Sequence, residues 1–494
     1  MLVGVFFAAG YAARMQVMAR EQQMAAHTRS RAPGIATGTR IASVDLQGAG
    51  DVDFRPVETL YSVLKNLREH YVEQLTPKVE GQMTYDALRS MLASLKDPNT
   101  RFLEPAQRKV IADAQENRHH GIGAVLAIRI VDAPVALGEL SGTAAKPVQA
   151  ASAKSAAAGA PKKPASAPAK GVKAAPAAKI REEHLIVVSV LPGSPAAEAG
   201  LKPGDDIIAI NGKSVLAFDP FQRIERMIKQ WRGGQIDRAL LQKKVDAEQE
   251  RVEKGISIYE AESMLMSEDK KPFELTVLSR GAARTRKVKV QPREFTVESV
   301  TSSVADGGAA GYIKINSFAK DTGDGFAEAM RDLQGRDLKG LIIDLRGVAG
   351  GDVEAATQVA RWFVPGKTLA MVARSRNRRA PIKVPAIEGE QRWTKPVVVL
   401  VNEGTARTGE VLASGLKEHG VARLVGQTTY GDFVETTLID QLDGSAVMMS
   451  TGAYLTSNGA SHEGKGLAVD LEVAAVDRQL KEAVKLLGST EGRS

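Results

Sequence analysis

The sequence predicts a multidomain α+β protein, and three patterns along its 494 residues indicate this class. Apolar residues recur at helical spacing in 51–118, for example from Val57 to Leu67, which predicts an N-terminal helical module. Runs of β-branched residues separated by turn signals fill much of 119–295 and predict a β-rich domain. From 296 to 494, strand-like and helix-like segments alternate, which is typical of an α/β layer with parallel strands.

The N-terminal run Leu2–Ala13 is apolar over 12 residues and is ended by Arg14. It is shorter than the about 20 residues that span a bilayer, and it resembles the end of a signal or anchor segment without its basic start. We therefore expect 1–50 to be a signal-like or anchor-like segment with a flexible spacer. The chain is then exported to the periplasm or cell envelope, with or without an N-terminal membrane anchor; a buried apolar stretch is the alternative.

Composition excludes several function classes. The chain has no cysteine, which rules out disulfides, thiolate metal sites and a nucleophilic thiol. Its net charge of +8 equals the charge of the seven Lys and one Arg between Ser141 and Arg181, a stretch with no acidic residue. That stretch is a low-complexity Ala/Pro/Lys tract, so we interpret it as a solvated linker and expect no nucleic-acid partner.

Two insertions are expected within the β-rich domain 119–295. The Ala/Pro/Lys-rich tract 133–182 cannot bury a core, and strand-like sequence resumes directly after it. The segment 233–271 is charged and helical in character. We therefore expect both segments to interrupt one domain rather than to separate two.

Three turn motifs of this domain resemble the core of a PDZ domain: Pro192–Ala196, Ala199–Asp205 and Ile210–Gly212. Pro195 suits the first turn of a short helix, and Asn211-Gly212 suits a hairpin turn. The resemblance implies that the loop Gly121-Ile122-Gly123-Ala124 offers backbone N–H groups to the C-terminal carboxylate of a peptide that adds as a strand. Protein C-termini or peptides are the partners it implies; the alternative is a PDZ fold that only packs against its neighbour.

Residues 296–494 resemble the C-terminal processing (tail-specific) peptidases, the S41 type of serine peptidase, over nearly their whole length. Five blocks carry this resemblance, the first of them upstream of the PDZ-like motifs: Asp97–Leu103, Gly311–Phe318, Asp344–Gly351, Asn402–Glu410 and Tyr454–Val473. The resemblance implies an α/β domain of the ClpP/crotonase-like kind. It also implies proteolysis by a Ser–Lys dyad, in which a neutral lysine activates a serine at a strand-to-helix turn.

All three catalytic positions that the resemblance transfers to this chain have changed type. The family's serine falls on Arg407, its lysine on Asp432 and the supporting glutamine on Thr436. Arginine is no nucleophile, since its guanidinium stays protonated. We predict an Arg407–Asp432 ion pair in a disabled site; the alternative places Arg407 in solvent. An oxyanion-like frame is expected to persist at Gly350, Gly351 and the N–H of Thr408.

Other chemistry finds little support in the sequence. Thr408 with His462 is the best substitute for the lost dyad, whereas Ser414 is expected to be structural. No Walker loop or zinc motif occurs, the histidines show no ligand spacing, and His119-His120 is interpreted as a surface pair, so no metal or cofactor is expected.

The sequence therefore indicates a pseudoenzyme: a catalytically inactive homologue that binds protein C-termini or peptides and regulates an active partner protease or assembles with itself. The alternative is an active S41-type serine or threonine endopeptidase with a rebuilt centre. A third hypothesis is that the chain is a structural scaffold, in which the insertion 233–271 binds a partner.

Overall fold

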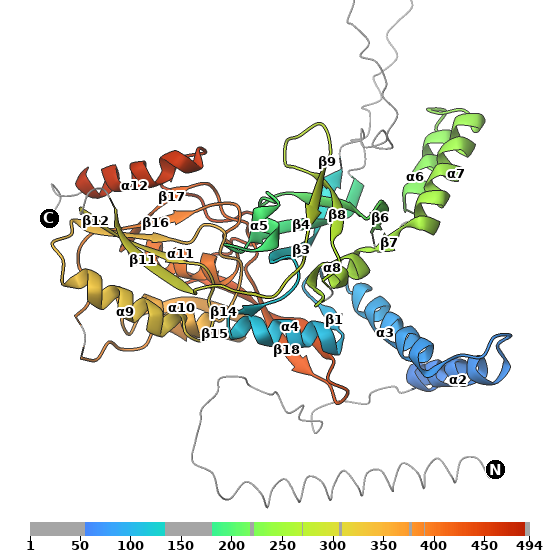
Figure 1. The fold of residues 1–494 in the computed structure, drawn as a ribbon, viewed down its shortest axis with the longest axis horizontal. Coiled ribbons are helices and arrows are strands. Elements are labelled where there is room, and N and C mark those ends of the chain that lie inside the picture. Colours follow the sequence, from blue (N-terminus) through green and yellow to red (C-terminus); the bar gives the residue numbers. More distant parts are fainter. Residues whose placement is uncertain are drawn as a thin grey trace, which may run out of the picture. The chain divides into compact units, whose positions relative to one another are not determined.

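The computed structural model describes residues 55–133, 180–217, 222–268, 270–305, 309–374, 378–389 and 391–489. The predicted signal-like segment 1–50 and nearly all of the predicted insertion 133–182 lie outside the described residues. The described part contains helices together with parallel and antiparallel sheets, as the predicted α+β class requires (Figure 1). No helix within these ranges is both long enough and apolar enough to cross a membrane.

The N-terminal region is helical but is joined to the C-terminal domain by a strand. Its elements are α2 (Arg55–His70), α3 (Pro77–Ala93), β1 (Arg101–Leu103) and α4 (Pro105–Gln115). Strand β1 pairs antiparallel with β19 (Ala446–Thr456), with Phe102 opposite Val447. The predicted helical module over 51–118 stays a prediction as a domain. Its strand β1 was not expected, because a three-residue strand is too short to show a period in the sequence.

The β-rich domain has a seven-stranded sheet around one apolar core. Its strands are β3 (Ala124–Ala133), β4 (Ile180–Val190), β5 (Asp206–Ile210), β6 (Lys213–Leu216), β7 (Ile256–Ser257), β8 (Phe273–Leu278) and β9 (Arg286–Val290). Its helices are α5 (Pro195–Glu198), α6 (Gln222–Arg232), α7 (Arg238–Lys254) and α8 (Ile258–Met266). Helix α8 buries Ile258, Ala261 and Leu265 in this core, so the part of the predicted insertion 233–271 that contains α8 belongs to the domain itself.

The C-terminal domain is built on a six-stranded sheet that is parallel except for its first strand. The strands in spatial order are β11 (Val300–Ala305), β12 (Ala310–Ile315), β13 (Gly340–Asp344), β16 (Val397–Val401), β17 (Ala422–Gly426) and β20 (Leu471–Glu472). The predicted α/β layer with parallel strands is confirmed.

Helices cover both faces of this sheet (Figure 1). They are α9 (Thr322–Gln334), α10 (Val353–Ala360) and α11 (Thr408–Glu418) on one face and α12 (Val476–Ser489) on the other. In β13, Ile343 joins the core under α9–α11 while Ile342 joins the core under α12. Burial on both faces explains why β16 is apolar throughout and why β13 is apolar up to its last residue, Asp344.

Two turns at the carboxyl ends of parallel strands position the candidate site. One turn follows β13 and leads to α10; the other follows β16 and leads to α11. An isolated bridge pairs Ala349 of the first turn with Ala406 of the second. The second sheet of this domain carries the rest of the site, with strands β14 (Thr368–Arg374), β15 (Arg378–Lys383), β18 (Val434–Asp440), β1 and β19. Strands β2 (Arg118–His119) and β10 (Phe295–Thr296) form a separate two-stranded ribbon.

Candidate functional site

Arg407 lies at a strained strand-to-helix turn. It precedes α11 with φ 50° and ψ −114°, a conformation that side chains rarely adopt. Such backbone strain costs about 1–3 kcal/mol and persists only where the surroundings enforce it. Here the N–H of Arg407 donates to Glu410 Oε2 over 3.1 Å, and the N–H of Ala406 donates to the carbonyl of Val348 over 2.9 Å. These hydrogen bonds hold the turn in place, and the turn directs the side chain at position 407 toward Asp432.

The predicted ion pair between Arg407 and Asp432 is present. Arg407 Nε lies 2.6 Å from Asp432 Oδ2, and the two side chains are 25% and 10% exposed. Asn99 hydrogen-bonds both members of the pair: its Oδ1 accepts from Arg407 Nη2 at 2.6 Å, and its Nδ2 donates to Asp432 Oδ1 at 3.4 Å. The structure therefore rules out the alternative in which Arg407 points into solvent.

Asn99 is the site residue that sequence reasoning missed. It lies just before β1, where Asp97 accepts hydrogen bonds from the N–H of Asn99 (3.0 Å) and from Thr100 Oγ1 (2.5 Å). The segment Asp97–Leu103 carries the family resemblance, and this is the one signal that could have indicated a role. Nothing in the spacing places Asn99 beside a residue 308 positions later.

Glu410 connects the turn at 407 to the loop that carries Asp432. Its Oε1 accepts from Thr429 Oγ1 and from the N–H of Gly431 (2.7 Å). Its Oε2 accepts from the N–H groups of Asp432 (3.0 Å) and Arg407 (3.1 Å). Burial raises the pKa of Glu410 to about 7, although all four hydrogen bonds lower it. Glu410 therefore positions both members of the ion pair.

The expected oxyanion-like frame is only partly available. The N–H of Gly350 donates to the carbonyl of Ala406 over 3.2 Å, so this donor is committed within the fold and the prediction for Gly350 is corrected. The parallel bridge between the two turns is the reason. Gly351 and Thr408 do lie together, since Thr408 Oγ1 donates to the carbonyl of Gly351 over 2.8 Å. The N–H of Thr408 belongs to the first turn of α11, which leaves it without an intrahelical acceptor.

Thr436, at the position of the family's glutamine, does not join the ion pair. It lies on β18 opposite Ser450, and among the described residues no hydrogen bond links it to Arg407 or Asp432. Threonine is too short to take over the reach of the lost glutamine, which is consistent with this separation.

The alternative nucleophiles are engaged elsewhere. The hydroxyl of Thr408 donates to Gly351, and that of Thr405 donates to the carbonyl of Leu345 over 2.8 Å. His462 packs against the ring of Phe433 at 5.5 Å between centroids, and within the described ranges no hydrogen bond joins it to Thr408. The hydroxyl of Ser414 donates to Val411 inside α11, as expected of a structural serine. In the part of the chain that the structure describes, no hydrogen bond therefore joins the hydroxyl of Thr405, Thr408 or Ser414 to a side chain that could act as its base.

The predicted carboxylate-binding loop is buried and closed in this structure. The N–H of Ile122 donates to the carbonyl of Leu265 at the end of α8 over 3.2 Å, so it is not free for a ligand. Carboxylate binding by the loop Gly121–Ala124 stays a prediction, and it requires the N–H of Ile122 to exchange its present acceptor. A Cβ on Gly121 would lie 2.5 Å from the same carbonyl, and one on Gly123 would lie 2.4 Å from Ser194. Close packing of α8 and α5 against the loop explains both glycines; Ala124 begins β3 opposite Val190.

Comparisons with known proteins agree with this architecture. The sequence model of peptidase family S41 matches residues 309–473, and that of a PDZ domain matches residues 186–237. The carboxy-terminal processing protease CtpA of Bacillus subtilis (strain 168) is 30% identical over 298 residues, which cover 60% of this chain but only 55% of that protein. The chloroplastic C-terminal processing peptidase of Tetradesmus obliquus is 26% identical over 439 residues, covering 86% of this chain and 75% of that protein.

One solved structure shows the same fold. A photosystem II D1 C-terminal processing protease matches with a TM-score of 0.54 and 23% identity, over 87% of this chain and 91% of that chain. Together with the two domain matches, this places the sequence blocks and the observed sheets in one known architecture. The chain is therefore similar to the peptidases of family S41 over residues 309–473 and to a PDZ domain over residues 186–237.

Proposed function

We propose that this chain is a catalytically inactive S41 homologue that binds protein C-termini or peptides, and that it regulates an active protease through this binding. The observation that carries the proposal is the 2.6 Å ion pair of Arg407 with Asp432, at the positions of the family's serine and lysine. A guanidinium supplies no nucleophile, and a carboxylate paired with it supplies no neutral amine base.

The edge of β3 supports a binding role. Among the described strands β3 pairs with β4 alone, so its other edge offers backbone groups to an added peptide strand. Arg129 of this strand lies over the ring of Tyr430 at 5.1 Å, and the N–H of Tyr430 donates to the carbonyl of Thr405. A peptide added to β3 would therefore lie beside the wall of the degenerate cleft.

Ligand entry has a structural consequence. Because Ile122 donates to Leu265, a peptide carboxylate must replace that carbonyl as the acceptor. We infer that binding moves the end of α8 away from the loop. We also propose that the chain acts outside the cytoplasm, on the strength of the signal-like run Leu2–Ala13.

A second candidate is an active endopeptidase with a rebuilt centre. It is favoured by one observation: the strained turn at 407 and its support by Glu410 are retained although the serine is not. Thr408, at the start of α11, would have to act as the nucleophile.

One assay separates these candidates. The full-length protein is incubated with an unfolded substrate that carries a C-terminal tag, and cleavage is followed by gel electrophoresis. We expect no cleavage by the wild type and saturable binding of the tagged C-terminus. Cleavage that T408A abolishes and R407A leaves intact would instead establish the active endopeptidase.

A further inference from the structure

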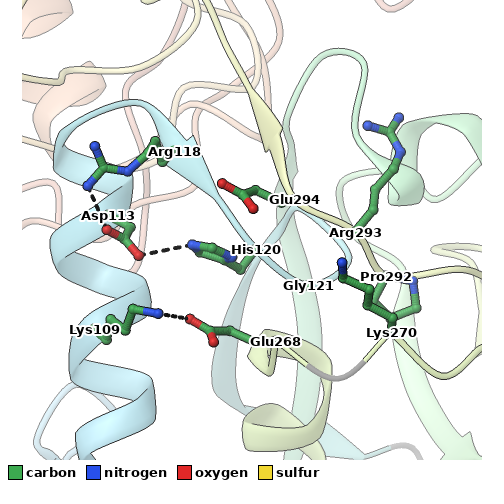
Figure 2. A pocket seen from close by; sticks show the side chains of 10 residues that line it. All are labelled: Lys109, Asp113, Arg118, His120, Gly121, Glu268, Lys270, Pro292, Arg293 and Glu294. Atoms are coloured by element: carbon green, nitrogen blue, oxygen red, sulfur yellow. Dashed lines mark hydrogen bonds and ion pairs between the residues drawn. The ribbon is translucent and has the colours of Figure 1, made fainter.

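A cluster of Asp113, His120 and Glu268 lies apart from the degenerate cleft, in a cavity of about 410 Å³ (Figure 2). One potential ligand atom of each residue lies within 4.8 Å of the other two. The residues come from three elements: α4, the turn between β2 and β3, and the segment after α8. We propose that this cluster binds a divalent transition-metal ion of the zinc type.

The geometry requires only small movements. His120 Nε2 and Asp113 Oδ2 are 3.0 Å apart. Tetrahedral zinc with bonds of about 2.0–2.1 Å separates its ligand atoms by about 3.3 Å, so this pair needs to open only slightly. The His120 and Asp113 side chains are 12% and 14% exposed and therefore held in place, whereas Glu268 is 45% exposed and can close the remaining distance.

The donor set selects the class of metal. One imidazole nitrogen and two carboxylate oxygens suit zinc and neighbouring divalent ions, whereas magnesium and calcium prefer oxygen ligands alone. The two carboxylates also balance the charge of a divalent ion. Three protein ligands leave one tetrahedral position for water or an incoming group.

Two cations pair with the carboxylates of the cluster. Arg118 contacts Asp113 Oδ1 at 2.8 Å, which leaves Oδ2 facing His120. Lys109 contacts Glu268 Oε1 at 2.6 Å (Figure 2). The Arg118 and Lys109 side chains are 52% and 60% exposed, and ion pairs this exposed contribute only about 0–1 kcal/mol. A metal ion can therefore displace Lys109, and removal of Lys109 should strengthen metal binding.

The bound ion would join parts of the chain that control the closed loop. His120 directly precedes Gly121, and Glu268 follows the end of α8, whose Leu265 carbonyl accepts from Ile122. An ion held by both His120 and Glu268 fixes the loop to α8 and holds that hydrogen bond in place. The metal site itself does not depend on whether the chain binds peptides.

The test is a titration of the chelator-treated full-length protein with zinc chloride, by calorimetry and by competition with a chromophoric chelator. We expect one saturable site whose affinity falls at least about tenfold in H120A and in E268Q. E294Q is the matched control, since Glu294 lines the same cavity outside the cluster, and it should bind as the wild type does. K109A should bind more tightly.

Cobalt(II) gives a second readout, because coordination by His120 would produce visible absorption bands that H120A lacks. Zinc affinity that is the same in the wild type, H120A and E268Q would overturn the proposal, as would a wild type without saturable binding. E268Q changes a half-exposed side chain, so it tests the site even if H120A fails to fold.

Discussion

Arg407 and Asp432 lie 2.6 Å apart, and each also hydrogen-bonds Asn99. The sequence resemblance assigns the family's nucleophile and base to these two positions. On that assignment, two opposite charges satisfy each other where a hydroxyl and an amine would react. The surroundings of the pair are held in place by Glu410, which accepts from the N–H groups of Arg407 at the turn and of Asp432 on the loop.

The strain at position 407 can be measured with two substitutions. R407A and R407G both remove the ion pair and leave the buried carboxylate of Asp432 without its charged partner. Only glycine adopts φ 50° and ψ −114° without strain, although its flexibility in the unfolded chain offsets part of that gain. We expect R407G to exceed R407A by about 1 kcal/mol in free energy of unfolding, measured by urea denaturation. Equal stability of the two variants would show that the turn is unstrained.

The retained frame predicts that peptidase activity can be rebuilt. The triple variant R407S/D432K/T436Q restores the residue types that the family resemblance assigns to the dyad and its support. We expect it to cleave the tagged unfolded substrate, whereas R407S alone should not, because a serine without a base is a weak nucleophile. The matched control is R407A/D432K/T436Q. A folded triple variant with no more activity than this control would mean that the cleft has lost more than the dyad.

Local signals account for the parts of the fold and site that the sequence predicts. Helix α11 (Thr408–Glu418) begins within the block Asn402–Glu410 that carries the family resemblance. The partnership of Arg407 with Asp432 follows from motif spacing combined with charge complementarity. The prediction of a short helix after Ser194 is also confirmed. The hydroxyl of Ser194 caps this helix by accepting a hydrogen bond from the N–H of Ala197.

Contacts between distant segments account for what the sequence could not predict. Asn99 reaches the ion pair only because β1 pairs with β19. The committed N–H groups of Gly350 and Ile122 depend on which backbone lies opposite, and residue types do not encode this. His119 was expected at the surface, but it is 8% exposed and stacks on Phe295. His120 joins Asp113 and Glu268 only through tertiary contacts, so no ligand spacing was visible.

Peptide binding at the PDZ loop can be tested through its first glycine. Alanine at Gly121 would face both a left-handed φ of 78° and the Leu265 carbonyl at 2.5 Å. We expect G121A to weaken binding of a fluorescent C-terminal peptide at least about tenfold in an anisotropy assay of the full-length chain, because the loop is displaced. G193A is the control, since Gly193 has a φ of 66° but open space around its Cβ position. Equal losses in both variants would contradict a role for this loop.

The pKa of Glu410 predicts a pH dependence of stability with a defined sign. Burial raises this pKa from the ordinary value of 4.5 to about 7, so between these pH values the native state holds a proton that the unfolded chain has released. The resulting stabilisation is fully present below pH 4.5 and is lost as the pH rises through 7. Since one pKa unit corresponds to about 1.4 kcal/mol, the loss amounts to roughly 2–4 kcal/mol.

The measurement compares the free energy of unfolding of the wild type and E410Q from pH 4 to pH 8. Glutamine does not titrate, so in E410Q the free energy of unfolding lacks the pH dependence that Glu410 contributes. The wild type should therefore lose stability relative to E410Q as the pH rises. Glu418 at the end of the same helix is the control. Burial raises the pKa of Glu418, but hydrogen bonds from Ser457 and neighbouring groups lower this pKa by more, so the net shift is downward. The wild type should therefore gain stability relative to E418Q with rising pH. If the free energies of unfolding of the wild type and E410Q instead change with pH in parallel, the pKa of Glu410 is not raised.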